Sequence, residues 1–194
     1  MPQLKPPDPR LRDSFAAAMD EFRAEGRGVA DDHSEIGHYL RDRQEAWSSD
    51  EAFRAFAEEV RAKRLEETPR PVGYVPGTEL WWVEDDEFLG RVGVRHRLTP
   101  ALLEIGGHIG YDVRPSARRR GHATAMLREA LIVARGLGIE TALVTCNVAN
   151  VGSRTVIERN GGVLDDQRQG SCGSGCRRAE IAAGMDKSQI SGRY

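Results

Sequence analysis

The sequence predicts an α/β protein, and three features of the chain lead to that prediction. Apolar residues recur at helical spacing between Phe15 and Val60, which is typical of amphipathic helices. From Leu80 the chain changes to short β-branched and aromatic runs separated by turn residues, as expected of strands. A strand, a glycine-containing turn, a helix and another strand then follow one another between residues 104 and 147. A unit of this kind implies that its two strands pair in parallel.

The N-terminal part of the chain is predicted to form three helices. The first nine residues contain four prolines, so we expect an extended, mobile arm. Asp8 then caps the first helix, with Pro9 at the first helical position. A second helix covers residues 34–47, and Ser48 with Glu51 forms a capping box that opens the third. The apolar stripes of these helices are Phe15, Ala18, Met19, Phe22, Ile36, Tyr39, Leu40, Phe53, Phe56, Ala57 and Val60.

The remaining elements follow from alternation and from helical spacing. In chain order they are strands at residues 80–83, 88–94 and 104–113, a helix at residues 123–135, a strand at residues 140–147 and a helix at residues 150–160. Gly161 and Gly162 end the last helix. We therefore expect a helical extension at residues 1–75, a core at residues 76–166 and a divergent segment at residues 167–194.

Composition and charge exclude several classes of function. A net charge of -2 over 194 residues provides no general attraction to nucleic acid or to anionic membranes. No apolar run approaches the roughly 20 residues of a membrane span, and the N-terminus lacks the apolar centre of a signal peptide. Three cysteines, an odd number, suit a reducing compartment. We therefore expect a cytoplasmic protein.

The clearest chemical signal is the turn between the strand at residues 104–113 and the following helix. Gly121 and Ala123 expose backbone N–H groups there, and the start of a helix attracts anions. The preceding arginines add positive charge. The turn is therefore predicted to hold phosphate groups, the alternative being an ordinary solvated basic turn. The residues expected to contribute are Val113, Arg118, Arg119, Arg120, Gly121, His122 through its backbone amide, Ala123 and Thr124.

The pattern Arg118-x-x-Gly121-x-Ala123 resembles the R/Q-x-x-G-x-G/A signature of the GNAT superfamily of acyl-CoA-dependent N-acetyltransferases. The resemblance covers about residues 79–166, and the segment Gly106 to Tyr111, which reads GGHIGY, resembles one branch that also has extra N-terminal helices. It implies a mixed central sheet with helices on both faces and acetyl-CoA as the acyl donor, without a metal. It also implies direct attack by a primary amine in a ternary complex. Three further residues match the segment that the family places beside the pantetheine arm and phosphates: Asn147, Asn150 and Ser153.

Acetyl transfer needs a group that accepts a proton from the incoming amine. Glu104 and His108 are the candidates, because regular alternation along residues 104–113 would place both on one face. A β-bulge at Gly106 and Gly107 would place Glu104 and His108 on different faces. In the alternative interpretations His108 is hydrogen-bonded within the sheet, Glu104 is a solvated carboxylate, or a water chain accepts the proton. A backbone N–H near Val113 would stabilise the oxyanion.

The sequence leaves two alternatives for the proton donor to the departing thiolate, a tyrosine and solvent. The family often uses a tyrosine on the second helix, where this chain has Ile157. Tyr111 is a possible replacement, although a tyrosine in a strand often serves only packing. Alternatively, solvent protonates the thiolate, since a thiol is a tolerable leaving group near neutral pH.

The last segment departs from the family, because residues 167–194 are rich in Gly, Ser and Arg. A disordered tail, a divergent pair of strands and a reading-frame change would each explain it. An incomplete sheet would leave an exposed edge that favours a homodimer. Cys172 and Cys176 provide too few ligands for a zinc site.

Two rival functions remain. One is a non-catalytic module that binds or senses acyl-CoA. The other is a Rossmann-type nucleotide-binding domain, which would need a G-x-G-x-x-G pattern and an acidic residue where Cys146 and Asn147 stand.

Overall fold

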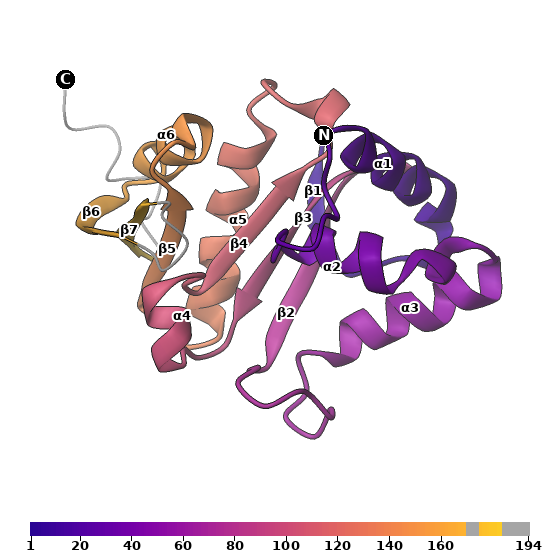
Figure 1. The fold of residues 1–194 in the computed structure, drawn as a ribbon, viewed down its shortest axis with the longest axis horizontal. Helices are drawn as coiled ribbons and strands as arrows, with labels where there is room; N and C mark the ends of the chain where they lie inside the picture. Colours follow the sequence, from indigo (N-terminus) through magenta and orange to yellow (C-terminus); the bar gives the residue numbers. More distant parts are fainter. Residues whose placement is uncertain (170–174, 184–194) are drawn as a thin grey trace.

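The computed structural model describes residues 1–169 and 175–183, with a four-stranded antiparallel sheet at its centre (Figure 1). Strands β2 (Gly77–Glu84) and β3 (Glu87–Arg95) form a hairpin, and β4 (Ile109–Val113) pairs with the free side of β3. The sheet order is β1-β2-β3-β4. The strand that leads into the predicted phosphate loop is therefore an outer strand of this sheet.

The N-terminal residues form a strand, so the predicted mobile arm is wrong. Strand β1 (Gln3–Lys5) pairs antiparallel with β2, Leu4 standing opposite Trp82. Proline lacks the N–H that a ladder needs, but it is tolerated next to an edge strand. Pro2 and Pro6 flank the paired residues, which leaves the three backbone groups between them free to pair.

Three helices cover one face of the sheet, at the right in Figure 1. They are α1 (Arg12–Ala24), α2 (Glu35–Asp42) and α3 (Asp50–Ala62), preceded by 3-10 turns at Pro9–Leu11 and Gln44–Trp47. All the residues of their predicted apolar stripes are buried, and all except Ala57 form one core. Trp81, Val83 and Phe88 of the sheet belong to the same core and pack against the helices.

The first two helical segments begin where the sequence predicts, but Asp8 caps the 3-10 turn before α1. The helix predicted at residues 34–47 divides into α2 and the 3-10 turn Gln44–Trp47, and the cap of the third helix differs. Asp8 accepts the Arg10 N–H, and Ser34 accepts the Gly37 N–H. The third helix is capped by Ser49, whose hydroxyl accepts the Ala52 N–H, and not by Ser48. Ser48 already closes the preceding 3-10 turn through its bond to the Glu45 carbonyl, so its neighbour is the first residue with the extended backbone that a cap requires.

The opposite face of the sheet is covered by α5 (His122–Gly136), which follows β4 through a 3-10 turn at Pro115–Ala117. Met126, Leu127 and Ala130 of this helix are fully buried against Val92 and Ile109. The prediction of an α/β fold with helices on both faces of the sheet is thus confirmed.

The strand predicted at residues 104–113 begins only at Ile109. Residues Pro100–Glu104 form the short helix α4, capped by Thr99. Gly106 and Gly107 then adopt φ angles of 112° and 59°, left-handed conformations that glycine adopts without steric cost. Two consecutive residues of this kind turn the chain and end any regular alternation before it reaches the sheet.

A second sheet packs beside the first. It consists of β5 (Thr141–Asn147), β7 (Gly175–Ala182) and β6 (Val163–Gln169) in that order, all antiparallel, and α6 (Val151–Arg159) connects β5 to β6. The expected parallel pairing of β4 with β5 is not found among the described residues. Among the described residues, the two sheets are joined by the bridge between Gly107 and Val144 and by the His108 N–H, which donates to the Leu143 carbonyl at 2.7 Å.

Part of the divergent segment at residues 167–194 therefore pairs as antiparallel strands, as in the second of the three interpretations. Residues 170–174, including Cys172, and residues 184–194 lie outside the described part. Within the described part, no helix combines the length and apolar character that crossing a membrane would require.

Candidate active site

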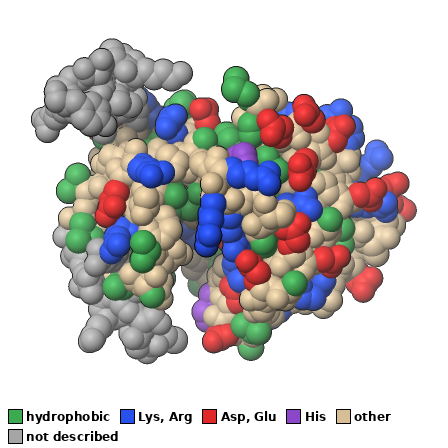
Figure 2. All heavy atoms as spheres, turned by 90° about the horizontal axis from the view of Figure 1, so that it is seen from above, with side chains coloured by type: hydrophobic (Ala, Val, Ile, Leu, Met, Phe, Trp, Pro, Cys, Tyr) green, Lys and Arg blue, Asp and Glu red, His purple; other side chains and the backbone are tan. Residues whose placement is uncertain are grey.

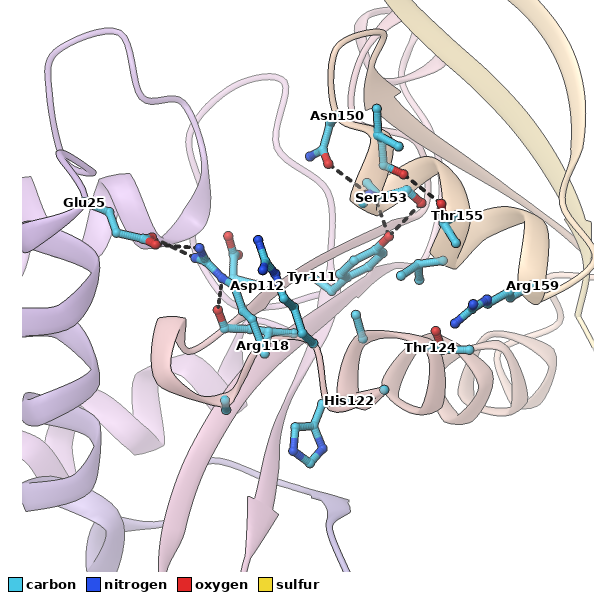
Figure 3. Close-up of a pocket in the computed structure, with 18 of the residues that line it drawn as sticks. Glu25, Tyr111, Asp112, Arg118, His122, Thr124, Asn150, Ser153, Thr155 and Arg159 are labelled. Atoms are coloured by element: carbon cyan, nitrogen blue, oxygen red, sulfur yellow. Dashed lines mark hydrogen bonds and ion pairs between the residues drawn. The ribbon is translucent and has the colours of Figure 1, made fainter.

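A cavity of about 780 Å³ opens between the end of β4, the start of α5 and α6 (Figure 3). The loop before α5 and the first turn of that helix form one wall, and α6 forms another. Glu25 and Arg27, which follow α1, lie at the remaining side. Figure 2 shows Lys and Arg side chains gathered along the hollow between the two halves of the molecule.

The loop before α5 presents a row of backbone donors. Arg119 and Gly121 have φ angles of 62° and 84°, and such left-handed residues curl a chain so that successive N–H groups face one concavity. The first intrahelical bond is donated by Ala125 to the Gly121 carbonyl at 3.1 Å. The N–H groups of the preceding residues, including Ala123 and Thr124, have no acceptor within the helix. Together with the helix dipole, they make this wall attractive to anions.

The arginines of the loop lie differently from one another. Arg118 forms a two-pronged ion pair with Glu25, at 2.6 and 2.8 Å, and its Nε donates to the Val113 carbonyl at 3.1 Å. Arg118 therefore ties the loop to α1 and to the end of β4. Arg119 lines the cavity, whereas Arg120 is exposed and does not.

His122 uses its imidazole outside the cavity. Its Nδ1 accepts a hydrogen bond from the Trp82 indole at 3.1 Å, and the ring points away from the neighbouring cavity residues in Figure 3. Its backbone, at the start of α5, is the part that lines the cavity wall with Ala123 and Thr124.

The register of β4 shows which backbone groups face the cavity side. The backbone N–H of Arg95 donates to the His108 carbonyl at 2.8 Å, and the backbone N–H of Arg114 donates to the Leu89 carbonyl at 2.9 Å. Since hydrogen-bonded pairs alternate along an antiparallel ladder, the N–H groups of Tyr111 and Val113 point away from β3, toward the gap before β5. This is the position that the sequence predicted for an oxyanion donor.

Tyr111 meets α6 across the cavity. Its hydroxyl lies 2.7 Å from the Ser153 hydroxyl, and the Ser153 N–H is held by the Asn150 side chain at 2.9 Å. Burial raises the pKa of the Tyr111 phenol to about 12. The phenol therefore stays protonated throughout the neutral range and can act as a proton donor.

Asp112 is a cavity carboxylate that the sequence analysis missed. It lies on the opposite face of β4 from Tyr111, with its oxygens 3.2 Å from Arg27 and 3.4 Å from Arg91. Arg27 in turn pairs with Asp32 at 2.8 Å. A carboxylate inside a short buried strand was the available signal, but its partner Arg27 lies in a distant loop that only the fold brings near.

Neither proton acceptor expected from the sequence lines the cavity. Glu104 is exposed at the end of α4, so it does not share a strand face with His108. The imidazole of His108 accepts the Leu143 N–H on Nδ1 at 3.0 Å, and its backbone N–H donates to the Leu143 carbonyl at 2.7 Å. Burial, aided by the nearby Arg95 charge, lowers the pKa of His108. His108 therefore joins the two sheets as a neutral ring.

The second predicted cofactor segment is only partly at the cavity. Asn150 and Ser153 line it, together with Thr155 and Arg159, which the sequence analysis did not select. Asn147 is exposed at the end of β5, where its side chain accepts the Ala149 N–H at 2.8 Å. Among the residues that the structure describes, no three His, Cys, Asp or Glu side chains lie close enough together to hold a metal ion.

Comparison with known proteins identifies the family. A family model described as an acetyltransferase (GNAT) domain matches residues 27–163, and the chain belongs to this family of acetyltransferases. The membership predicted from the Arg118-to-Ala123 pattern is thus confirmed, and so is the N-acetyltransferase class. The assignment to a particular branch from the GGHIGY segment stays a prediction. No curated protein matches the sequence.

Solved structures share the fold at low identity. The microcin C7 self-immunity acetyltransferase MccE, in complex with acetyl-CoA and AMP, has a TM-score of 0.63 at 14% identity, covering 93% of this chain and 92% of that one. An acetyltransferase from Salmonella typhimurium that modifies the N-terminal serine of ribosomal protein L7/L12 has a TM-score of 0.59 at 15% identity, with 95% of each chain covered. A GNAT acetyltransferase from Streptococcus pneumoniae has a TM-score of 0.60 at 11% identity, covering 95% of this chain and 100% of that one.

Proposed function

We propose that the protein transfers the acetyl group of acetyl-CoA to a primary amine, by direct attack within a ternary complex. The observation that carries this proposal is the set of residues that line the cavity at β4. Its anion-attracting wall adjoins the Tyr111–Ser153 pair on one side and Asp112 on the other. A wall that attracts anions, a phenol and a carboxylate that is paired with Arg27 and Arg91 thus line one space, which is the combination that the proposal requires.

The donor side of the cavity fits acetyl-CoA. The backbone N–H groups of Ala123 and Thr124, with the charge of Arg119, would hold the pyrophosphate. Asn150 and Ser153 line the wall along which the pantetheine arm would run. MccE, which shares this fold, is described in complex with acetyl-CoA.

The chain supplies three contributions to the transfer. The Val113 N–H would stabilise negative charge on the thioester oxygen, as an oxyanion donor does. Binding both substrates in one cavity would make the attack effectively unimolecular. The Tyr111 hydroxyl holds a proton that it can give to the departing thiolate, with Ser153 fixing its direction.

On the acceptor side, we assign to Asp112 the orientation of the incoming ammonium group. It lines the cavity on the face of β4 opposite to Tyr111, whereas Glu104 and His108 lie outside. A proton travelling from the amine to either of those two residues would need a chain of water molecules.

The test is a screen of primary amines with acetyl-CoA, following thiol release and confirming the acetylated product by mass spectrometry. The proposal expects turnover with at least one class of amine, and loss of that turnover in Asp112→Asn with acetyl-CoA binding preserved. Ile157, which is buried where the family often has a tyrosine, favours the rival function of a non-catalytic acyl-CoA-binding module. Acetyl-CoA binding without acetylation of any amine would support that rival.

A further inference from the structure

Four arginines line the cavity, and they differ in whether a carboxylate neutralises them. Arg27 pairs with Asp32 and Asp112, and Arg118 pairs with Glu25. Within the described ranges, Arg119 and Arg159 have no carboxylate partner. These two side chains therefore keep their full positive charge toward the cavity.

Arg159 belongs to a different element from the phosphate loop. It is exposed in the last turn of α6, and in Figure 3 it reaches toward Thr124 in the first turn of α5. The neighbouring Asn160 side chain donates to the Thr124 carbonyl at 3.2 Å and to the Val156 carbonyl at 2.8 Å. These bonds hold the end of α6 against the start of α5, which fixes where the Arg159 side chain begins.

The position of Arg159 along the cavity indicates which part of a ligand it meets. In Figure 3, Tyr111 lies between Glu25 and Arg159. If the reacting thioester lies at Tyr111 and Val113, as the proposed function requires, a ligand that runs along the start of α5 brings its nucleotide end toward Arg159.

Acetyl-CoA carries two phosphates in its pyrophosphate and a third on the ribose 3′ oxygen. The loop amides and Arg119 can serve the pyrophosphate, which leaves the third phosphate without a partner. A guanidinium binds phosphate through two parallel hydrogen bonds. We propose that Arg159 binds the 3′-phosphate and so makes the enzyme select CoA over 3′-dephospho-CoA. This inference rests on the proposed function.

The test is calorimetric titration of the whole protein with acetyl-CoA and with acetyl-3′-dephospho-CoA. The wild type is expected to bind acetyl-CoA about tenfold more tightly than the dephospho form, as for one charge-assisted contact. Arg159→Gln should weaken acetyl-CoA about tenfold and remove the difference between the ligands, and Arg159→Lys should restore part of it. Arg154→Gln is the matched control, because Arg154 is on the same helix, outside this cavity, and pairs only loosely with Glu158 at 3.8 Å.

The possible failures are distinguishable. Equal weakening of both ligands by Arg159→Gln would place Arg159 at the pyrophosphate and overturn the inference. An unchanged preference in Arg159→Gln would also overturn it. If the wild type bound neither ligand, both the proposed function and the inference on Arg159 would fail. Circular dichroism and thermal melting of each variant establish that a loss of binding is not a loss of fold.

Discussion

The hydroxyl of Tyr111 on β4 lies 2.7 Å from the hydroxyl of Ser153 on α6, across the cavity that separates the two elements. Ser153 is itself fixed, because its backbone N–H bonds to the Asn150 cap. Ile157, one turn further along α6, is buried in the core. The chain thus presents a phenol from β4 to the cavity, hydrogen-bonded to a serine of α6.

Tyr111→Phe tests whether this phenol donates a proton. We expect kcat to fall about 100-fold, the lower range for a lost general acid, while the Kd for acetyl-CoA stays near the wild-type value. Steady-state kinetics and calorimetry give the two numbers, and Ser153→Ala should lower kcat less. An unchanged kcat in Tyr111→Phe would mean that solvent protonates the thiolate.

The pH dependence provides a separate test of the same residue. Burial raises the pKa of Tyr111 to about 12, so the proton-donating form persists well above the ordinary tyrosine value near 10. Near pH 10, the kcat of the wild type should therefore follow the same pH dependence as the kcat of Tyr111→Phe. A decline near pH 10 in the wild type alone would contradict the assigned environment of Tyr111.

Gly121→Val tests the phosphate loop. The residue has a φ of 84°, and an added Cβ would meet no atom within 4 Å, so the cost is backbone strain and obstruction of the ligand. We expect the Kd for acetyl-CoA to rise more than tenfold. Gly138→Val is the matched control, since Gly138 has a φ of 82° and equally open surroundings beyond the far end of α5. If both variants lost acetyl-CoA binding equally, the loss would come from backbone strain alone and not from obstruction of the ligand.

Breaking the buried ion pair between Glu79 and Arg91 is expected to destabilise the helical side of the sheet. Their side chains are 4% and 8% exposed and lie 2.8 Å apart, and Tyr39 donates to the other Glu79 oxygen at 2.8 Å. Arg91→Met would leave a buried carboxylate without its counter-ion and should lower the free energy of unfolding by about 3–5 kcal/mol. Urea denaturation measures this loss.

The double variant Glu79→Leu with Arg91→Met provides the control for this pair. The double variant removes both charges of the pair, and Asp112, which also loses Arg91, keeps Arg27 as its counter-ion. It should therefore recover part of the stability that Arg91→Met loses. A double variant at least as unstable as Arg91→Met would show that the damage comes from lost packing, not from an unpaired charge.

His108 should make folding stability depend on pH. Its pKa is lowered in the folded protein, so the unfolded chain binds the proton more readily. The free energy of unfolding should therefore fall as the pH drops below about 6.5, the ordinary histidine value. His108→Asn keeps an acceptor for the Leu143 N–H but does not titrate. The wild type should lose more stability than this variant between about pH 7 and about pH 5; parallel losses would contradict the role of His108.

The features that the sequence predicted correctly are mostly local. Asp8 caps the 3-10 turn that runs into α1 through the N–H of Arg10, only two residues away, and the second helix starts next to Ser34 as expected. The turn from Arg118 to Ala123 forms the expected helix start because the left-handed conformation at Gly121 and the orphan N–H groups depend on adjacent residues.

The features that it missed depend on distant parts of the chain. Strand β1 exists because Leu4 meets Trp82, a pairing that a proline-rich segment gives no reason to expect. Glu104 was assigned to a strand because two glycines do not reveal whether they continue, bulge or reverse it. Asp112 was overlooked because its significance comes from the cavity and from Arg27, 85 residues earlier.

The central claim is that the cavity between β4 and α6 binds acetyl-CoA through the loop that ends at Gly121. Calorimetric titration of the wild-type protein with acetyl-CoA, and with NADH as a control dinucleotide, tests it most directly. The account predicts micromolar binding of acetyl-CoA, about one molecule per chain, and no comparable binding of NADH. Absence of acetyl-CoA binding, or tight binding of NADH instead, would contradict it.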